Sequence, residues 1–89
     1  MNKYTKFKLC AELDINTSGK LLYLILMDLI DENNMIVIPQ KKIGTALGMS
    51  RDTVSRNLRK LERIGAISIV PTFNEYGGQM ANQYQVWEG

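Results

Sequence analysis

The sequence has no histidine and only one cysteine, Cys10. A single thiol cannot form an intramolecular disulfide, and no cluster of Cys and His exists that could bind zinc. Histidine is also the commonest general base, so its absence removes most familiar pairs of nucleophile and base. We therefore expect no metal, no cofactor and no enzymatic activity, and we interpret Cys10 as a small buried apolar side chain.

Long apolar runs are absent too. The longest, residues 21–27, is far shorter than the roughly 20 residues that a membrane span requires. No basic segment followed by an apolar stretch and a cleavage site opens the chain, so we expect a cytoplasmic protein without membrane contact. A length of 89 residues, with 45% apolar and 22% charged residues, is typical of one soluble globular domain.

The charge is distributed unevenly along the chain. The net charge is only +2, but residues 40–65 carry +5 and the rest of the chain carries −3. Positive charge gathered in one third of a nearly neutral protein is the pattern expected of a nucleic-acid-binding face. The cations of this segment are Lys41, Lys42, Arg51, Arg56, Arg59, Lys60 and Arg63.

The first half of the chain predicts one helix and one short strand. Residues 17–32 form a helical pattern that begins at an N-cap, either Thr17 or Ser18. This helix is apolar on nearly all sides, which indicates either the central helix of the core or a helix shared with another chain. Residues 35–38 are rich in β-branched side chains and predict a short strand ended by Pro39.

Two helices with a very tight turn between them are predicted next, over residues 41–47 and 50–64. Gly48 suits the left-handed residue that follows a helix, and Ser50 is a favourable N-cap for the next helix. A connection this short cannot return the second helix antiparallel to the first, so the pattern predicts a helix-turn-helix.

Two alternating runs follow, residues 66–70 and 83–87, and they predict two half-buried strands joined through a turn near Gly77 and Gly78. We expect Tyr84 and Trp87 to face the core. The order of elements predicts an α+β fold, a winged helix-turn-helix with a three-helix core and a small antiparallel sheet as the wing.

This domain is predicted to cover residues 17–89. Residues 1–16 precede it as an N-terminal arm or a short edge strand, because charged and apolar residues alternate there.

The helix over residues 50–64 has two contrasting faces. Val54, Leu58, Leu61 and Ile64 recur at intervals of four, three and three, so they form one buried stripe. The opposite side is rich in guanidinium groups, which suit contacts with guanine and with phosphate. We expect base contacts from Arg51, Thr53, Ser55 and Arg56, and phosphate contacts from Arg59, Lys60, Arg63, Lys41 and Lys42.

Residues 43–67 resemble the winged-helix core of bacterial GntR- and MarR-type regulators. The family pattern is Ile-Ala-x-x-Leu-Gly-x-Ser-Arg-x-Thr-Val followed by Leu-x-x-Leu-x-x-x-Gly-x-Ile, and residues 43–54 and 58–67 match it except at Gly44. Gly44 stands where those families usually have Ala, which we expect to loosen that helix slightly. The resemblance implies that the following residues face DNA: Ser50, Arg51, Thr53, Ser55 and Arg56. Residues 18–24 are also similar to the first helix of winged-helix domains in plasmid and phage replication initiators.

The predicted wing departs from that pattern, because no basic residue follows Arg63. The loop over residues 73–82 offers amides, Tyr76 and glycine backbone, while Glu75 opposes contact with DNA. Two interpretations stay open. The loop either makes hydrogen bonds to the minor groove or to phosphates, or it is a flexible hairpin tip.

The leading hypothesis is a small, sequence-specific transcriptional regulator that binds double-stranded DNA and senses no small-molecule ligand. A single winged module makes a small interface with DNA, so we expect a homodimer that uses the first helix and the arm with Phe7 and Leu9. The alternatives are a module of a replication initiator and a winged helix that binds other proteins.

Overall fold

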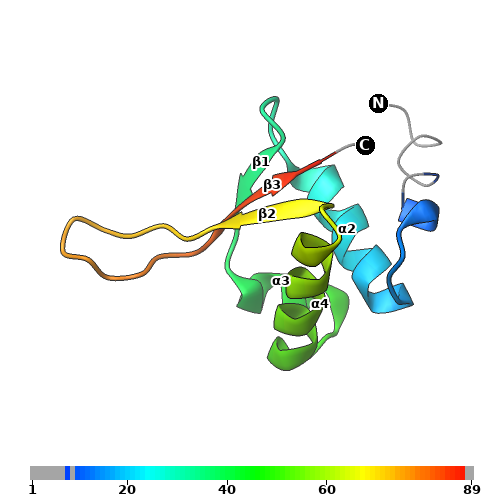
Figure 1. The fold of residues 1–89 in the computed structure, drawn as a ribbon. Coiled ribbons are helices and arrows are strands. Elements are labelled where there is room, and N and C mark those ends of the chain that lie inside the picture. The colour runs from blue at the N-terminus through cyan, green and yellow to red at the C-terminus, as the bar shows by residue number, and fades with distance from the viewer. Residues whose placement is uncertain (1–7, 9, 88–89) are drawn as a thin grey trace.

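The computed structural model describes residue 8 and residues 10–87. Residues 8 and 10–12 are helical, so a short strand is the wrong prediction at these positions; residues 1–7 and 9, with Phe7 and Leu9, lie outside the described residues. The elements that follow are α2 (Thr17–Leu29), β1 (Met35–Val37), α3 (Gln40–Leu47), α4 (Arg51–Arg63), β2 (Ile67–Val70) and β3 (Gln83–Val86). Together they form a winged helix-turn-helix, as predicted (Figure 1).

Helix α2 begins and ends earlier than the sequence pattern predicts. Its N-cap is Asn16, whose Oδ1 accepts a hydrogen bond of 2.8 Å from the N–H of Gly19. The helix ends at Leu29 because Ile30 adopts an extended conformation. The carboxylate of Asp31 then accepts hydrogen bonds from two backbone N–H groups of the turn into β1. Residues 30–32 of the predicted helix therefore lie outside α2.

The three strands form an antiparallel sheet in the order β1-β3-β2, so the last strand lies in the centre. Tyr84 of β3 lies opposite Ile36 on one side and Ile69 on the other. Tyr84 is fully buried, as predicted, but Trp87 is 46% exposed, so its predicted position in the core is wrong. Side chains alternate along a strand, and a residue three positions after Tyr84 therefore lies on the opposite face.

The core lies between the helices and one face of the sheet. Helix α4 packs against α2, α3 and β2. The hydroxyl of Tyr23 in α2 also donates a hydrogen bond of 2.6 Å to the carbonyl oxygen of Trp87, directly after β3. The buried apolar residues are Leu22, Tyr23, Leu26, Met27, Ile43, Val54, Leu58, Leu61, Ala66, Ile67, Tyr84 and Val86.

The turn between α3 and α4 depends on two glycines. Gly48 ends α3 in the left-handed conformation (φ 66°), which glycine adopts without steric cost. A Cβ atom at Gly44 would lie only 2.8 Å from the carbonyl oxygen of Met49. The expectation that Gly44 only loosens α3 is therefore incomplete, because the missing side chain lets the turn pack closely against the helix.

The segment between β2 and β3 extends away from the body of the molecule as a long hairpin, the wing (Figure 1). Phe73 and Gln79 form an isolated antiparallel bridge near its tip. Asn74 stabilises the turn, because its side-chain oxygen accepts hydrogen bonds from the N–H groups of Tyr76 and Gly78. The wing is therefore held by its own hydrogen bonds, although most of its side chains are exposed.

Candidate nucleic-acid interface

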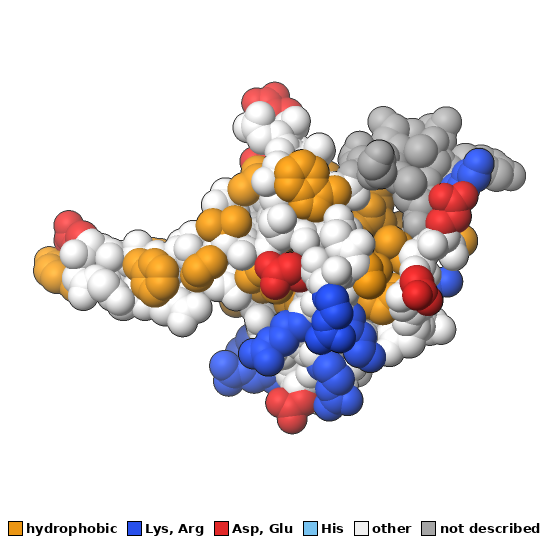
Figure 2. Space-filling view, in the orientation of Figure 1, with side chains coloured by type: hydrophobic (Ala, Val, Ile, Leu, Met, Phe, Trp, Pro, Cys, Tyr) orange, Lys and Arg blue, Asp and Glu red, His pale blue; other side chains and the backbone are white. Residues whose placement is uncertain are grey.

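Helix α4 directs a basic face away from the core. Its inner side is formed by Val54, Leu58 and Leu61, each with no exposed surface. The prediction that Ile64 extends this buried stripe is wrong, because Ile64 is the C-cap after the last turn of α4 and is 42% exposed. Six residues of the opposite side line one shallow hollow: Asp52, Ser55, Arg56, Arg59, Lys60 and Arg63. The Lys and Arg side chains in Figure 2 gather over this part of the molecule, whereas the wing shows none. The helical spacing thus predicts this face correctly; the contact of these residues with DNA stays a prediction.

The guanidinium groups on this face are available for a ligand. Within residue 8 and residues 10–87, neither an ion pair nor a hydrogen bond to another side chain occupies Arg56, Arg59 or Arg63. All three are exposed. An unpaired, solvated guanidinium can bind an anion without first breaking an intramolecular contact.

One of the two acidic residues of α4 is turned toward the sheet. The Oε2 atom of Glu62 accepts a hydrogen bond of 3.0 Å from the N–H of Ile69 in the edge strand β2. This contact ties α4 to the sheet and also satisfies a backbone donor at an open sheet edge. The other acidic residue, Asp52, lies in the first turn of α4, where the helix dipole favours a negative charge.

The start of α4 is fixed by Ser50. Its Oγ accepts a hydrogen bond of 3.2 Å from the N–H of Thr53 and donates one of 2.9 Å to Thr53 Oγ1. The Thr53 hydroxyl accepts in this pair, so its own proton is free to be donated to a ligand. The N-cap predicted from the sequence is confirmed, and it also orients one of the predicted base-contacting side chains.

Helix α3 brings Lys41 and Lys42 into its first turn, and both side chains are exposed. The N-cap is Pro39, which makes no side-chain hydrogen bond to the helix. Backbone N–H groups at an uncapped helix start, next to two lysines, suit a phosphate group. The predicted phosphate contacts of these two lysines stay a prediction.

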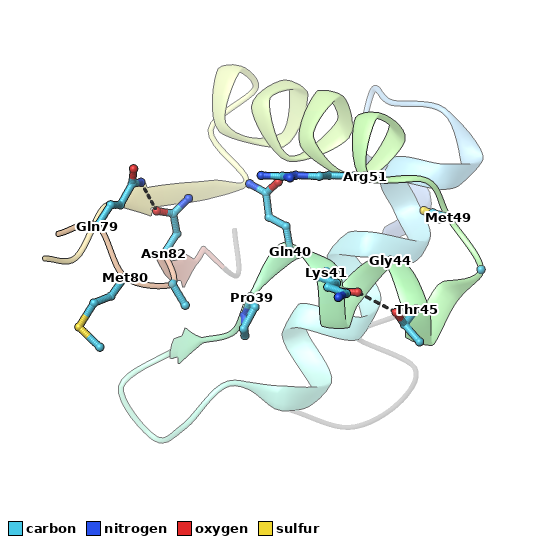
Figure 3. Close-up of a pocket in the computed structure, with 12 residues that line it drawn as sticks. Pro39, Gln40, Lys41, Gly44, Thr45, Met49, Arg51, Gln79, Met80 and Asn82 are labelled. Carbon is cyan, nitrogen blue, oxygen red and sulfur yellow. Dashed lines mark hydrogen bonds between the residues drawn. The ribbon is translucent and has the colours of Figure 1, made fainter. Parts of the chain in front are cut away.

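A groove of about 870 Å³ separates the helix-turn-helix from the wing (Figure 3). Lys41 of α3 and Arg51 of α4 contribute positive charge to its helical wall. The wing contributes no charge: its side of the groove is formed by Gln79, Met80, Ala81 and Asn82. The two amides of the wing are near each other, with Gln79 Nε2 donating to Asn82 Oδ1 over 3.4 Å.

A smaller hollow of about 270 Å³ lies beside α4 and includes Ser55, Arg59 and Glu62. Gln40 and Asn82 line both this hollow and the groove. They therefore lie where the basic face of α4, the start of α3 and the base of the wing come together. The sequence pattern did not single out Gln40 or Asn82, because neither is charged and their proximity arises only from the fold.

In the part of the chain that the structure describes, Cys10 and the acidic residues form no second site. Cys10 is partly buried and its Sγ donates to the carbonyl oxygen of Lys20 over 3.2 Å. Burial raises the pKa of this thiol, and the nearby positive charge of Lys20 opposes that rise. Among the described residues, no group of three His, Cys, Asp or Glu side chains could hold a metal ion, and no helix has the length and apolar character to cross a membrane.

Comparison with known proteins agrees with this geometry. A family model described as a helix-turn-helix domain matches residues 13–67, which include α2, α3, α4 and the intervening turn. The chain belongs to this helix-turn-helix family. The match covers the two helices of the motif and the whole basic face of α4. No curated protein matches the chain.

The helix-turn-helix domain is also similar in fold to a solved structure described as a possible transcriptional regulator from Methanosarcina mazei Go1. The TM-score is 0.64 at 15% sequence identity, and the match covers 98% of this chain and 67% of the other. It includes the wing as well as the helices, so it supports the complete winged architecture. The resemblance to GntR- and MarR-type regulators in particular has no further support from these matches.

Proposed function

We propose that this domain binds double-stranded DNA in a sequence-specific manner and acts as a small transcriptional regulator. The observation that carries the proposal is the outer face of α4, where unpaired cations lie on the second helix of a helix-turn-helix. The second helix of this motif is the one that enters the major groove. The helix-turn-helix family and the fold of the regulator-like neighbour support the same function.

The side chains divide into two groups under this proposal. Arg51, Thr53, Ser55 and Arg56 lie in the first two turns of α4, where base edges are normally reached. Arg59, Lys60 and Arg63 lie further along the same face and contact the backbone phosphates, as do Lys41 and Lys42 from α3. Ser50 contributes by fixing the start of α4.

A salt titration tests DNA binding. If four or five cations neutralise phosphates, the plot of log K against log salt has a slope of about −4. Lys42→Ala should weaken binding to every duplex by a similar factor and make the slope about one unit shallower. Lys8→Ala is the matched control, because this exposed lysine lies outside both helices of the motif and should leave the slope unchanged. Binding that does not depend on salt would contradict the proposal.

Selection of bound sequences from a random duplex pool tests specificity. We expect a defined consensus, and Arg56→Ala should relax the preference at one or two base pairs at a cost of about 1–3 kcal/mol. Salt-dependent binding without any enriched sequence would contradict a specific regulator. Mapping the bound sites in a genome would separate a promoter operator from the repeated sites that a replication initiator requires.

A homodimer through α2 is part of this proposal. Leu21 and Leu29 of α2 are 45% and 47% exposed, so the helix keeps some apolar surface outside the core. Two copies would read two half-sites and enlarge a small interface with DNA. Sedimentation at micromolar concentration, with and without DNA, should reveal a dimer; a monomer under both conditions would contradict this arrangement.

A further inference from the structure

Two uncharged side chains, Gln40 and Asn82, lie beside the basic face without being part of it. Gln40 is the first residue of α3, and Asn82 directly precedes β3 at the base of the wing. Both are partly buried, so their positions are restricted by their neighbours. Figure 3 shows Gln40 extending from α3 toward the same region as Arg51, with Asn82 on the wing side of the groove.

The hydrogen-bonding groups of this amide pair are largely free. Within residue 8 and residues 10–87, the amide of Gln40 has no hydrogen-bond partner. Asn82 only accepts the long 3.4 Å contact from Gln79, so its NH₂ group donates to no other described residue. A primary amide carries a donor and an acceptor side by side, which matches the edge of adenine in the major groove.

The surroundings place this amide pair beside the proposed recognition face. Gln40 and Asn82 share one hollow with Ser55 and Arg59 of α4. They share the larger groove with Lys41 and Arg51, whose charges attract the DNA backbone to the same region. The wing has no cation of its own, so its base can add hydrogen bonds but no phosphate neutralisation.

We propose that Gln40 and Asn82 are specificity-determining residues that read base pairs next to those contacted by α4. The inference rests on the proposed function, because it needs DNA bound to α4. It divides the interface into two parts. The cations of α3 and α4 provide the salt-dependent affinity, and the amide pair provides sequence preference that is independent of salt.

The test compares Gln40→Ala and Asn82→Ala with the wild-type protein, by selection from a random duplex pool and by salt titration on the selected duplex. Each variant should lose preference at one or two base pairs flanking the α4 site, with a loss of about 5- to 100-fold on the preferred duplex. The slope against log salt should stay at the wild-type value. Gln85→Ala is the matched control, because this amide lies on β3 at a position that alternates with the core-facing Tyr84 and Val86.

Three outcomes decide the matter. A lost preference with an unchanged slope supports the inference. The inference is overturned if a variant loses affinity equally for all duplexes, or if its consensus is unchanged. In that case the wild-type protein still binds with a steep salt dependence, so the proposed function stands. If the wild-type protein itself shows no salt-dependent binding, the proposed function fails first. Circular dichroism of each variant confirms that the fold is retained.

Discussion

Substitutions of Ser50, the N-cap of α4, should change the stability of the domain and its DNA affinity independently. Replacing Ser50 by Ala removes the acceptor of the Thr53 N–H and the donor to the Thr53 hydroxyl. N-cap losses of this kind cost about 0.5–2 kcal/mol. Both hydrogen bonds lie at the surface, so water can replace the lost partner and we expect the cost to be about 1 kcal/mol. For a domain of this size that lowers Tm by about 4–8 °C.

Ser50→Asp is the informative partner of this variant. A carboxylate caps a helix as well as a hydroxyl does, and at this end of α4 it also interacts favourably with the helix dipole. Tm should therefore stay at or above the wild-type value. The same carboxylate adds a negative charge at the start of the proposed DNA-binding face, so affinity should fall and the slope against log salt should become about one unit shallower.

Thermal unfolding followed by circular dichroism, together with DNA titration, measures both effects. Ser50→Asn is the neutral control, because it keeps an acceptor for the cap without adding charge. The reasoning would be refuted if Ser50→Ala had the wild-type Tm, or if Ser50→Asp lost as much stability as Ser50→Ala. If Ser50→Asp bound DNA with the affinity of the wild-type protein, the start of α4 would not be part of the binding surface.

Three further predictions follow from other contacts. Gly44→Ala should lower the free energy of unfolding in urea although Ala is the better helix former by about 1 kcal/mol, because the new Cβ would meet the Met49 carbonyl oxygen; a more stable variant would contradict this. Glu62→Gln keeps an acceptor for the Ile69 N–H but removes a negative charge, so DNA affinity at low salt should rise and the salt slope should steepen; unchanged binding would contradict this. Since burial raises the pKa of Cys10, a thiol reagent should modify this residue more slowly at pH 7 in the folded protein than in the urea-unfolded chain. With increasing pH, the modification rate of the folded protein should still rise where that of the unfolded chain has levelled off; equal rates would contradict this.

The sequence pattern predicts the helix-turn-helix well because its signals are local. Ser50 and Gly48 mark the helix ends through their own capping and left-handed conformations. The spacing of Val54, Leu58 and Leu61 then orients α4, since residues three and four apart share a helix face. The basic face follows directly from this orientation.

The parts that the sequence did not predict depend on contacts between distant residues. Gly44 reads as a weak helix former, and only the approach of the Met49 carbonyl shows why it fits there. Trp87 reads as a core residue, but the register of β3 places it on the outer face of the sheet. The indole N–H of Trp87 donates a hydrogen bond of 3.1 Å to Ser68 Oγ, so this donor has a partner on the neighbouring strand β2.

Asn57 of α4 is a polar residue on the inner side of the helix that the sequence pattern did not single out. It is only 3% exposed. Its Nδ2 donates to the carbonyl oxygen of Thr53, one turn earlier in α4. The inner stripe of α4 is therefore not wholly apolar. That Gln40 and Asn82 line the same hollow could not be predicted from the sequence either, because the two residues are far apart in the chain and meet only in the folded domain.

The central position of β3 has a consequence for the order in which the protein is made. Strands β1 and β2 each pair only with β3 in the described sheet, so neither can form its ladder until residues 83–86 have been synthesised. The carbonyl oxygen that anchors Tyr23 follows immediately after these residues. Chains emerge from the ribosome N-terminal end first. The two helices of the motif are thus complete well before the sheet can form, and a nascent chain stalled inside the wing would lack the core side chains of Tyr84 and Val86.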